Sequence, residues 1–204
     1  MENKRMKNPN KTFTVLLIVL VLLSIIVFLI GNEQLFLFIN QGIANPVLDF
    51  IVLNILIPLF FLLGIIPFIM LFFDKYRVLG AFSLFSGPFC YVVGSLIKLF
   101  FKMPRPFNVL SISVIGPWHV GQFSFPSTTT MLAFGFALPF LIQRKPKWSL
   151  FFLTLSILVG FSVIYTGFHF PSDVLGGIFF SILIVLLLNK IKTIIINKMI
   201  EHGA

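Results

Sequence analysis

The sequence LGAFSLFSGPFCYVVGSLIKLFFKMPRP, residues 79–106, decides the fold class of this protein. An apolar run long enough to cross a bilayer, which takes about 20 residues, ends here in three cations, Lys98, Lys102 and Arg105. The rest of the chain has the same character: of 204 residues, 58% are hydrophobic and only 10% are charged. A soluble domain of this size cannot bury so much apolar surface. The composition therefore predicts an all-α, polytopic membrane protein.

Six apolar runs are predicted to span the membrane, at residues 12–30, 50–73, 79–101, 126–142, 148–166 and 172–191. The first follows several basic residues, as in a signal peptide, but its apolar part is too long and no small-x-small cleavage site follows. It is therefore predicted to be a retained anchor. The segment 35–48 is half apolar and too short to span, so we expect it at the outer interface. No internal repeat is visible, and residues 1–204 are predicted to form a single membrane-embedded domain.

The distribution of basic residues predicts the orientation. Twelve of the fifteen Lys and Arg residues lie near the two termini or in two short predicted loops, 74–77 and 143–147. The other three are Lys98, Lys102 and Arg105 on the opposite side. Because basic residues accumulate on the cytoplasmic side, both termini are predicted to be cytoplasmic and the three cations extracytoplasmic. The basic residues flank apolar runs instead of forming one patch, which argues against a nucleic-acid partner.

A candidate anion site follows from this topology. The third span ends outward near Lys98 and Arg105, whose guanidinium can bind phosphate oxygens in bidentate fashion. The fourth and sixth spans both start on the same face, so their free N–H groups and positive dipole ends point there. Ser127 is placed to cap the fourth span. These features predict a site for an anionic lipid headgroup.

His169 and Asp173 add a catalytic element to this face. Pro171 suits the first turn of a helix, so His169 is predicted to end a loop beside the helix that carries Asp173. Asp173 could hold the imidazole in one tautomer and leave the other nitrogen as a nucleophile toward phosphorus. Ionisable residues at a membrane edge are functional by default.

Each of these features also has a simpler explanation. Lys98 and Lys102 are also compatible with simple snorkelling, in which the side chain extends so that its charge reaches the membrane interface. The start of the fourth span also fits an ordinary helix start. His119 is predicted to be a solvated loop residue. Two acidic residues are predicted to be interfacial loop charges, Glu33 and Asp49.

Taken together, the residues resemble the type 2 phosphatidic acid phosphatase family, integral-membrane relatives of vanadium haloperoxidases. The first motif of that family is Lys, six residues and Arg-Pro, and it matches Lys98 to Arg105-Pro106. The third motif is Ser-Arg, five residues, His, three residues and Asp. It is matched at Ser162, His169 and Asp173. The resemblance covers nearly the whole chain.

Three motif positions depart from the family. The second motif, Pro-Ser-Gly-His, is matched only at Pro126-Ser127, with Thr128 and Thr129 in place of Gly and His, and Val163 replaces the Arg of the third motif. The family's His protonates the leaving group, which Thr129 cannot do at neutral pH, and such help is worth roughly 10²–10⁴ in rate. Loss of one preorganised donor at the Arg position costs on the order of 3 kcal/mol.

The resemblance implies a six-helix bundle with an external phosphatase site and neither a metal nor another cofactor. In it, His169 would attack phosphorus to form a phosphohistidine and Asp173 would orient it. Lys98, Arg105 and the start of the fourth span, with Ser127 and Thr128, would hold the phosphoryl oxygens. Tyr165 and His119 are conceivable substitutes for the missing acid.

Three functions are compatible with the sequence. The first is a lipid phosphatase of the cell membrane with weakened activity, acting at the outer leaflet on a phosphatidate-like, phosphatidylglycerophosphate-like or polyprenyl diphosphate lipid. The second is a protein that binds a phosphorylated lipid without hydrolysing it, as a carrier, sensor or partner subunit. A transporter is disfavoured, because the spans carry no charged residue at mid-depth.

Overall fold

The computed structural model describes residues 9–112, 114–117 and 121–201 of the chain. The regular elements among these residues are helices, and no strand forms among them apart from an isolated bridge between Pro104 and Phe123. The elements are α1 Pro9–Ile30, α2 Asn32–Leu37, the π-helix η1 Phe38–Gly42, α3 Pro46–Ile51, the π-helix η2 Val52–Leu56, α4 Ile57–Leu59, α5 Leu62–Met70, α6 Asp74–Phe101, α7 Pro106–Val109, α8 Thr128–Ile142, α9 Pro146–Tyr165 and α10 Pro171–Glu201.

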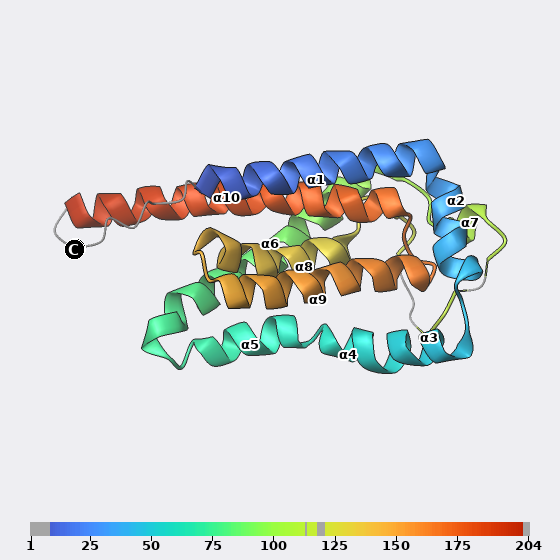
Figure 1. Ribbon diagram of the computed structural model, residues 1–204. Coiled ribbons are helices and arrows are strands. Elements are labelled where there is room, and N and C mark those ends of the chain that lie inside the picture. The colour runs from blue at the N-terminus through green and yellow to red at the C-terminus, as the bar shows by residue number, and fades with distance from the viewer. Residues whose placement is uncertain (1–8, 113, 118–120, 202–204) are drawn as a thin grey trace.

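The long helices lie side by side, so the bundle has two distinct ends (Figure 1). One end carries α2, α7 and the connection between α9 and α10. The opposite end carries the turn between α5 and α6, the turn between α8 and α9, the start of α1 and the end of α10. The first end is called the site end below, because the motif residues gather there.

Five helical segments are long and apolar enough to cross a membrane, namely Phe13–Ile30, Pro46–Met70, Asp74–Phe101, Pro146–Tyr165 and Pro171–Met199. The chain is therefore built as a polytopic membrane protein. The run predicted as the fourth span, 126–142, forms α8, which has only 15 residues. At about 1.5 Å per residue it is shorter than the hydrocarbon core of about 30 Å. A total of six spans remains a proposal.

Helix α8 is the centre of the bundle. Eleven of its residues are buried, and α5, α6, α9 and α10 pack around it. It approaches α6 closely at Gly135, where an added Cβ would lie 2.8 Å from the Cα of Gly87. The Ser83 hydroxyl donates to the Phe136 carbonyl at 2.8 Å, and Ser156 of α9 donates to the Ala133 carbonyl at 3.0 Å. Small residues and interhelical hydroxyl bonds of this kind hold membrane helices together, and here they position the start of α8.

The second span is irregular. It runs through α3, η2 and α4, turns at residues 60–61 and continues as α5. Pro58 has no N–H to donate, and the next amides form short-range bonds: Phe60 N–H to the Ile57 carbonyl and Phe61 N–H to the Pro58 carbonyl, both 3.1 Å. Irregular backbone at membrane depth is tolerated where it is covered by protein or lines a cavity.

The segment predicted at the interface, 35–48, lies across the site end as the end of α2, η1 and the start of α3 (Figure 1). Buried Asn40 donates to the Tyr165 carbonyl at 2.7 Å, and Asn32 accepts from the Ser172 amide at 3.0 Å. These bonds attach the segment to the end of α9 and the start of α10.

The predicted loop at 74–77 is wrong, because these residues form the first turn of α6. Asp74 places a negative charge at the positive end of the helix dipole, and its carboxylate lies 2.7 Å from the Arg77 guanidinium three residues later. Both interactions stabilise a helix start. Residues 192–201, predicted as a tail, continue α10.

Candidate active site

Main-chain hydrogen bonds join the segments that carry the motifs. At the starts of α8 and α10, the Ser127 amide donates to the Asp173 carbonyl at 3.0 Å. After α9 the chain turns at Gly167, where the φ of 89° favours glycine. The His169 amide then donates a hydrogen bond to the Val163 carbonyl at 3.1 Å. Residues distant in sequence therefore meet at the site end.

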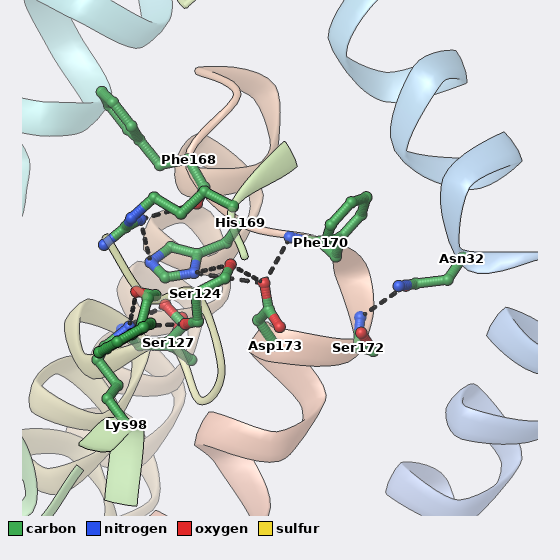
Figure 2. A network of polar contacts seen from close by, with 12 residues as sticks. Asn32, Lys98, Ser124, Ser127, Phe168, His169, Phe170, Ser172 and Asp173 are labelled. Carbon is green, nitrogen blue, oxygen red and sulfur yellow. Dashed lines mark hydrogen bonds and ion pairs between the residues drawn. The ribbon is translucent and has the colours of Figure 1, made fainter. Parts of the chain in front are cut away.

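Ser124 lies at the centre of the polar network, between His169 and Asp173 (Figure 2). Its hydroxyl donates to Asp173 Oδ2 and lies 3.3 Å from His169 Nδ1. The direct distance from Nδ1 to Asp173 Oδ2 is longer, 3.5 Å, and the Phe170 amide also donates to that oxygen, at 2.8 Å. Ser124 is fully buried. It was absent from the sequence predictions, because it belongs to none of the three motifs.

These contacts determine the state of the imidazole. Because the Ser124 proton is donated to Asp173, the Ser124 oxygen is an acceptor for the proton on His169 Nδ1, and Nε2 is left with a lone pair. Burial lowers the pKa of His169 to about 4, although the hydrogen bond and charge of Asp173 oppose the shift. The side chain is therefore neutral at pH 7, as a nucleophile requires.

The two predicted phosphate ligands from the first motif approach this pair. Arg105 Nη1 lies 3.4 Å from His169 Nε2 and donates to the Phe168 carbonyl at 2.8 Å, and Nε donates to Gly121. Lys98 Nζ donates to the carbonyls of Phe123 at 2.9 Å and Ser124 at 2.6 Å. Lysine has three donors and arginine five, so both retain donors for an anion.

The start of α8 faces the same cluster (Figure 2). Ser127 is the N-cap residue, and its hydroxyl oxygen accepts from the Thr130 amide at 3.4 Å and the Thr130 hydroxyl at 2.9 Å. Thr128, the first residue of the helix, is buried. The positive end of the α8 dipole therefore adds to the field of Lys98 and Arg105. Lys102, by contrast, is exposed at the end of α6.

Two of the three positions that depart from the family motifs lie together on another side of the site. Thr129 and Val163, both half-buried, line a cavity of about 350 Å³. Its other lining residues come from the second span, the end of α9 and the following turn: Leu56, Ile57, Phe60, Phe61, Val159, Ser162, Thr166 and Phe168.

Tyr165, a conceivable substitute acid, is used elsewhere. Its hydroxyl donates to Asp49 Oδ1 at 2.5 Å, which is beside α3 and not at the His169 cluster. Asp49 was predicted to be a loop charge; that prediction is wrong, because it lies within α3 and accepts this bond. His119, the other candidate acid, lies outside the described residues.

Comparison with known proteins identifies relatives of this chain. An undecaprenyl-diphosphatase of Sulfolobus acidocaldarius is 26% identical over 178 residues, covering 81% of this chain and 84% of that protein. Undecaprenyl-diphosphatase BcrC of Bacillus subtilis is 40% identical over 95 residues, covering 46% of this chain and 47% of BcrC. The match to BcrC thus spans about half the length of that relative.

Solved structures share the fold. The crystal structure of Aquifex aeolicus LpxE matches with a TM-score of 0.66 and 28% identity over 78% of this chain and 94% of that chain. A PAP2-type phosphatidylglycerolphosphate phosphatase from Bacillus subtilis matches with a TM-score of 0.57 and 23% identity over 92% and 97% of the two chains. The sequence model of the PAP2 superfamily matches residues 78–195, which include every motif position discussed above. The resemblance predicted from the motifs is confirmed, and the chain belongs to the PAP2 superfamily.

Proposed function

We propose that the protein is a membrane lipid phosphatase that removes the terminal phosphate of a diphosphate lipid, with His169 as the nucleophile. The observation that supports this most directly is the state of His169: Ser124 and Asp173 engage Nδ1, so that Nε2 carries the lone pair, which faces Arg105 Nη1 at 3.4 Å. The relatives named as undecaprenyl-diphosphatases support the same class of substrate.

The reaction would proceed in two displacements. His169 Nε2 attacks the terminal phosphorus, the bond from that phosphorus to the bridging oxygen breaks, and the lipid monophosphate leaves with the bridging oxygen. Water then attacks the phosphohistidine, and inorganic phosphate and the free imidazole are formed while one proton passes to solvent. Lys98, Arg105 and the start of α8 stabilise the charge on the equatorial oxygens in both steps.

The preference for a diphosphate follows from Thr129. Without an acid at this position the leaving group departs nearly unprotonated. A lipid phosphate is a far better leaving group than a lipid alkoxide, so diphosphate cleavage loses least when the acid is missing.

The test is phosphate release by purified protein from a polyprenyl diphosphate and from phosphatidate, side by side. We expect the diphosphate to turn over at least roughly a hundredfold faster, given the usual value of a general acid. As a control, Lys102→Ala, which removes an exposed cation outside the site, should release phosphate from both lipids at the wild-type rates. Equal or faster turnover of the monoester would contradict the proposal.

The proposed location is the cell membrane, with the site end facing outward. The distribution of basic residues supports this orientation. In a Cys90→Ser background, a cysteine at exposed Ser111 should react with an impermeant reagent added to intact cells, and one at exposed Lys147 should not. The reverse pattern would refute an external site.

A second function, lipid binding without hydrolysis, is favoured by one observation. Lys98 and Arg105 already donate to main-chain carbonyls, and the positions of the family's acid and second arginine are uncharged. Under this alternative, polyprenyl diphosphate binds, but neither wild type nor His169→Ala releases phosphate.

A further inference from the structure

Two apolar hollows lie near the polar cluster. One, of about 590 Å³, lies between α1 and α10 and is lined among others by Leu20, Phe28, Phe125 and Phe180. The other is the cavity of about 350 Å³ that contains Thr129 and Val163. Both volumes fall within the ordinary range of ligand pockets. A lipid whose phosphates lie at the cluster could place its hydrocarbon chain in either.

We infer that the cavity lined by Thr129 and Val163 is the subsite for the hydrocarbon chain of the lipid. The inference rests on the proposed function for the headgroup, and it gives the two motif departures a positive role. They remove two polar groups and also leave an apolar space beside the phosphate cluster.

The first support is continuity with the site. The wall includes Thr129, two residues after the cap Ser127, and Phe168, which precedes His169 and whose carbonyl accepts from Arg105. The hollow between α1 and α10 has no motif position in its wall; it is lined instead by residues such as Phe125, whose ring packs against Phe101 at 5.0 Å and Phe180 at 6.3 Å between ring centroids. Of the two hollows, only the cavity of about 350 Å³ is therefore bounded by motif positions.

The second support is the chemistry of the wall. Its two hydroxyls on α9 are turned back to their own helix: Ser162 donates to the Leu158 carbonyl at 2.8 Å and Thr166 to the Ser162 carbonyl at 2.7 Å. No charged residue lines the cavity. An ionic group would enter without a partner, whereas an apolar chain gains about 25 cal/mol per Å² buried.

The third support is the second span. The break at Pro58 and the turn at residues 60–61 place Ile57, Phe60 and Phe61 on the cavity wall. Phe61 is also 66% exposed on the outside of the bundle, in a segment apolar enough to lie in the bilayer. A chain could therefore enter from the membrane beside this ring.

The test is photo-crosslinking with a methylene-bridged, non-hydrolysable prenyl diphosphonate that carries a diazirine in the isoprene unit next to the headgroup. We expect labelled peptides from residues 56–61 and 159–168 by mass spectrometry. Because the probe cannot be hydrolysed, the readout does not depend on catalysis. Labelling without phosphate release would refute the proposed reaction and retain this subsite, whereas phosphate release with labelling elsewhere would refute only the subsite.

Variants sharpen the test. Val163→Phe fills the cavity and should lower the labelling yield at least roughly fivefold. Ile157→Phe adds the same ring on the exposed face of the same helix and should leave the yield unchanged. Thr129→Leu fills the cavity from the side of α8, and it replaces Val163→Phe as the test variant if Val163→Phe does not fold. The inference would be overturned if the labels fell on residues 20–28 and 172–180, or if no specific label formed. It would also be overturned if Ser24→Phe, and not Val163→Phe, lowered the labelling yield.

Discussion

The two sides of the candidate site differ in what they retain from the family pattern. On one side, His169, Ser124 and Asp173 form a buried polar network, with Arg105 beside the imidazole. On the other, Thr129 and Val163 line an apolar cavity. The side that holds the proposed nucleophile keeps the polar residues of the family pattern, whereas the side that holds Thr129 and Val163 carries no charged group. A substrate whose leaving group departs without protonation and which carries a long apolar chain would suit both sides of the site.

Replacement of the nucleophile should have the largest effect. His169→Ala removes the nitrogen that would attack phosphorus, so we expect phosphate release from a polyprenyl diphosphate to fall at least about a thousandfold. The measurement is phosphate release together with acid-quenched trapping of phosphohistidine. The variant should still bind the diphosphonate probe; retained turnover would show that the polar side of the site is not catalytic.

Restoring the family residues at positions 129 and 163 should raise the activity toward a lipid monoester, because it returns the missing polar groups to the apolar side of the site. Thr129→His with Val163→Arg supplies the acid and the cation together, and at saturating substrate we expect at least roughly tenfold faster release from a lipid monoester. Each change alone should do less, because groups that act as a unit are not additive. The gain should vanish when His169→Ala is added.

The double variant carries a folding risk, because an arginine buried without a partner destabilises a protein. Normal membrane insertion and a monodisperse elution profile must therefore be shown first. A well-folded double variant that remains inert toward every lipid phosphate would favour the binding protein over the enzyme.

Ser124→Ala tests whether the serine positions the imidazole. Loss of the hydroxyl leaves Nδ1 3.5 Å from Asp173 Oδ2, too far for a good hydrogen bond without movement. We expect kcat to fall about fivefold with little change in KM, because the variant keeps the cations that bind phosphate. Ser124→Thr, which keeps the hydroxyl, should restore most of kcat. An equal loss in both variants would point to packing instead of positioning.

The smallest predicted effect is on pH dependence. With a pKa of about 4, His169 stays neutral at pH 5, whereas an imidazole with the ordinary value of 6.5 would be mostly protonated. The contribution of His169 to the rate should therefore stay nearly constant from pH 7 to pH 5 and fall only as the pH approaches 4. A pH–rate profile of kcat/KM with an apparent pKa near 6.5 assigned to His169 would contradict the buried, neutral state.

The same lowered pKa affects stability. In the unfolded chain His169 takes up its proton near pH 6.5, and in the folded protein only near pH 4. The stabilisation from the neutral buried form is thus complete above pH 6.5 and is lost as the pH falls toward 4. The Tm should drop by several degrees between pH 7 and pH 5, and His169→Gln, which does not titrate, should show a smaller drop.

Local sequence determined the membrane character and much of the site. Apolar runs and their charged ends predicted most of the helices, because hydrophobic length and composition are local properties. The spacings from Lys98 to Arg105 and from His169 to Asp173 predicted the family, which the superfamily match confirms. Helix starts at Thr128 and Pro171 also followed from local proline and serine chemistry.

Tertiary structure alone decided the rest. Nothing in the local sequence indicates that Ser124 lies between His169 and Asp173, since that contact depends on the packing of a loop against two helices. The same holds for the cavity that unites Thr129, Val163 and the broken second span. These residues share no sequence period, and only the packing of α8 and α9 brings them together. Periodicity and composition describe how one segment meets membrane or water, whereas a binding site depends on distances between segments that the sequence does not encode locally.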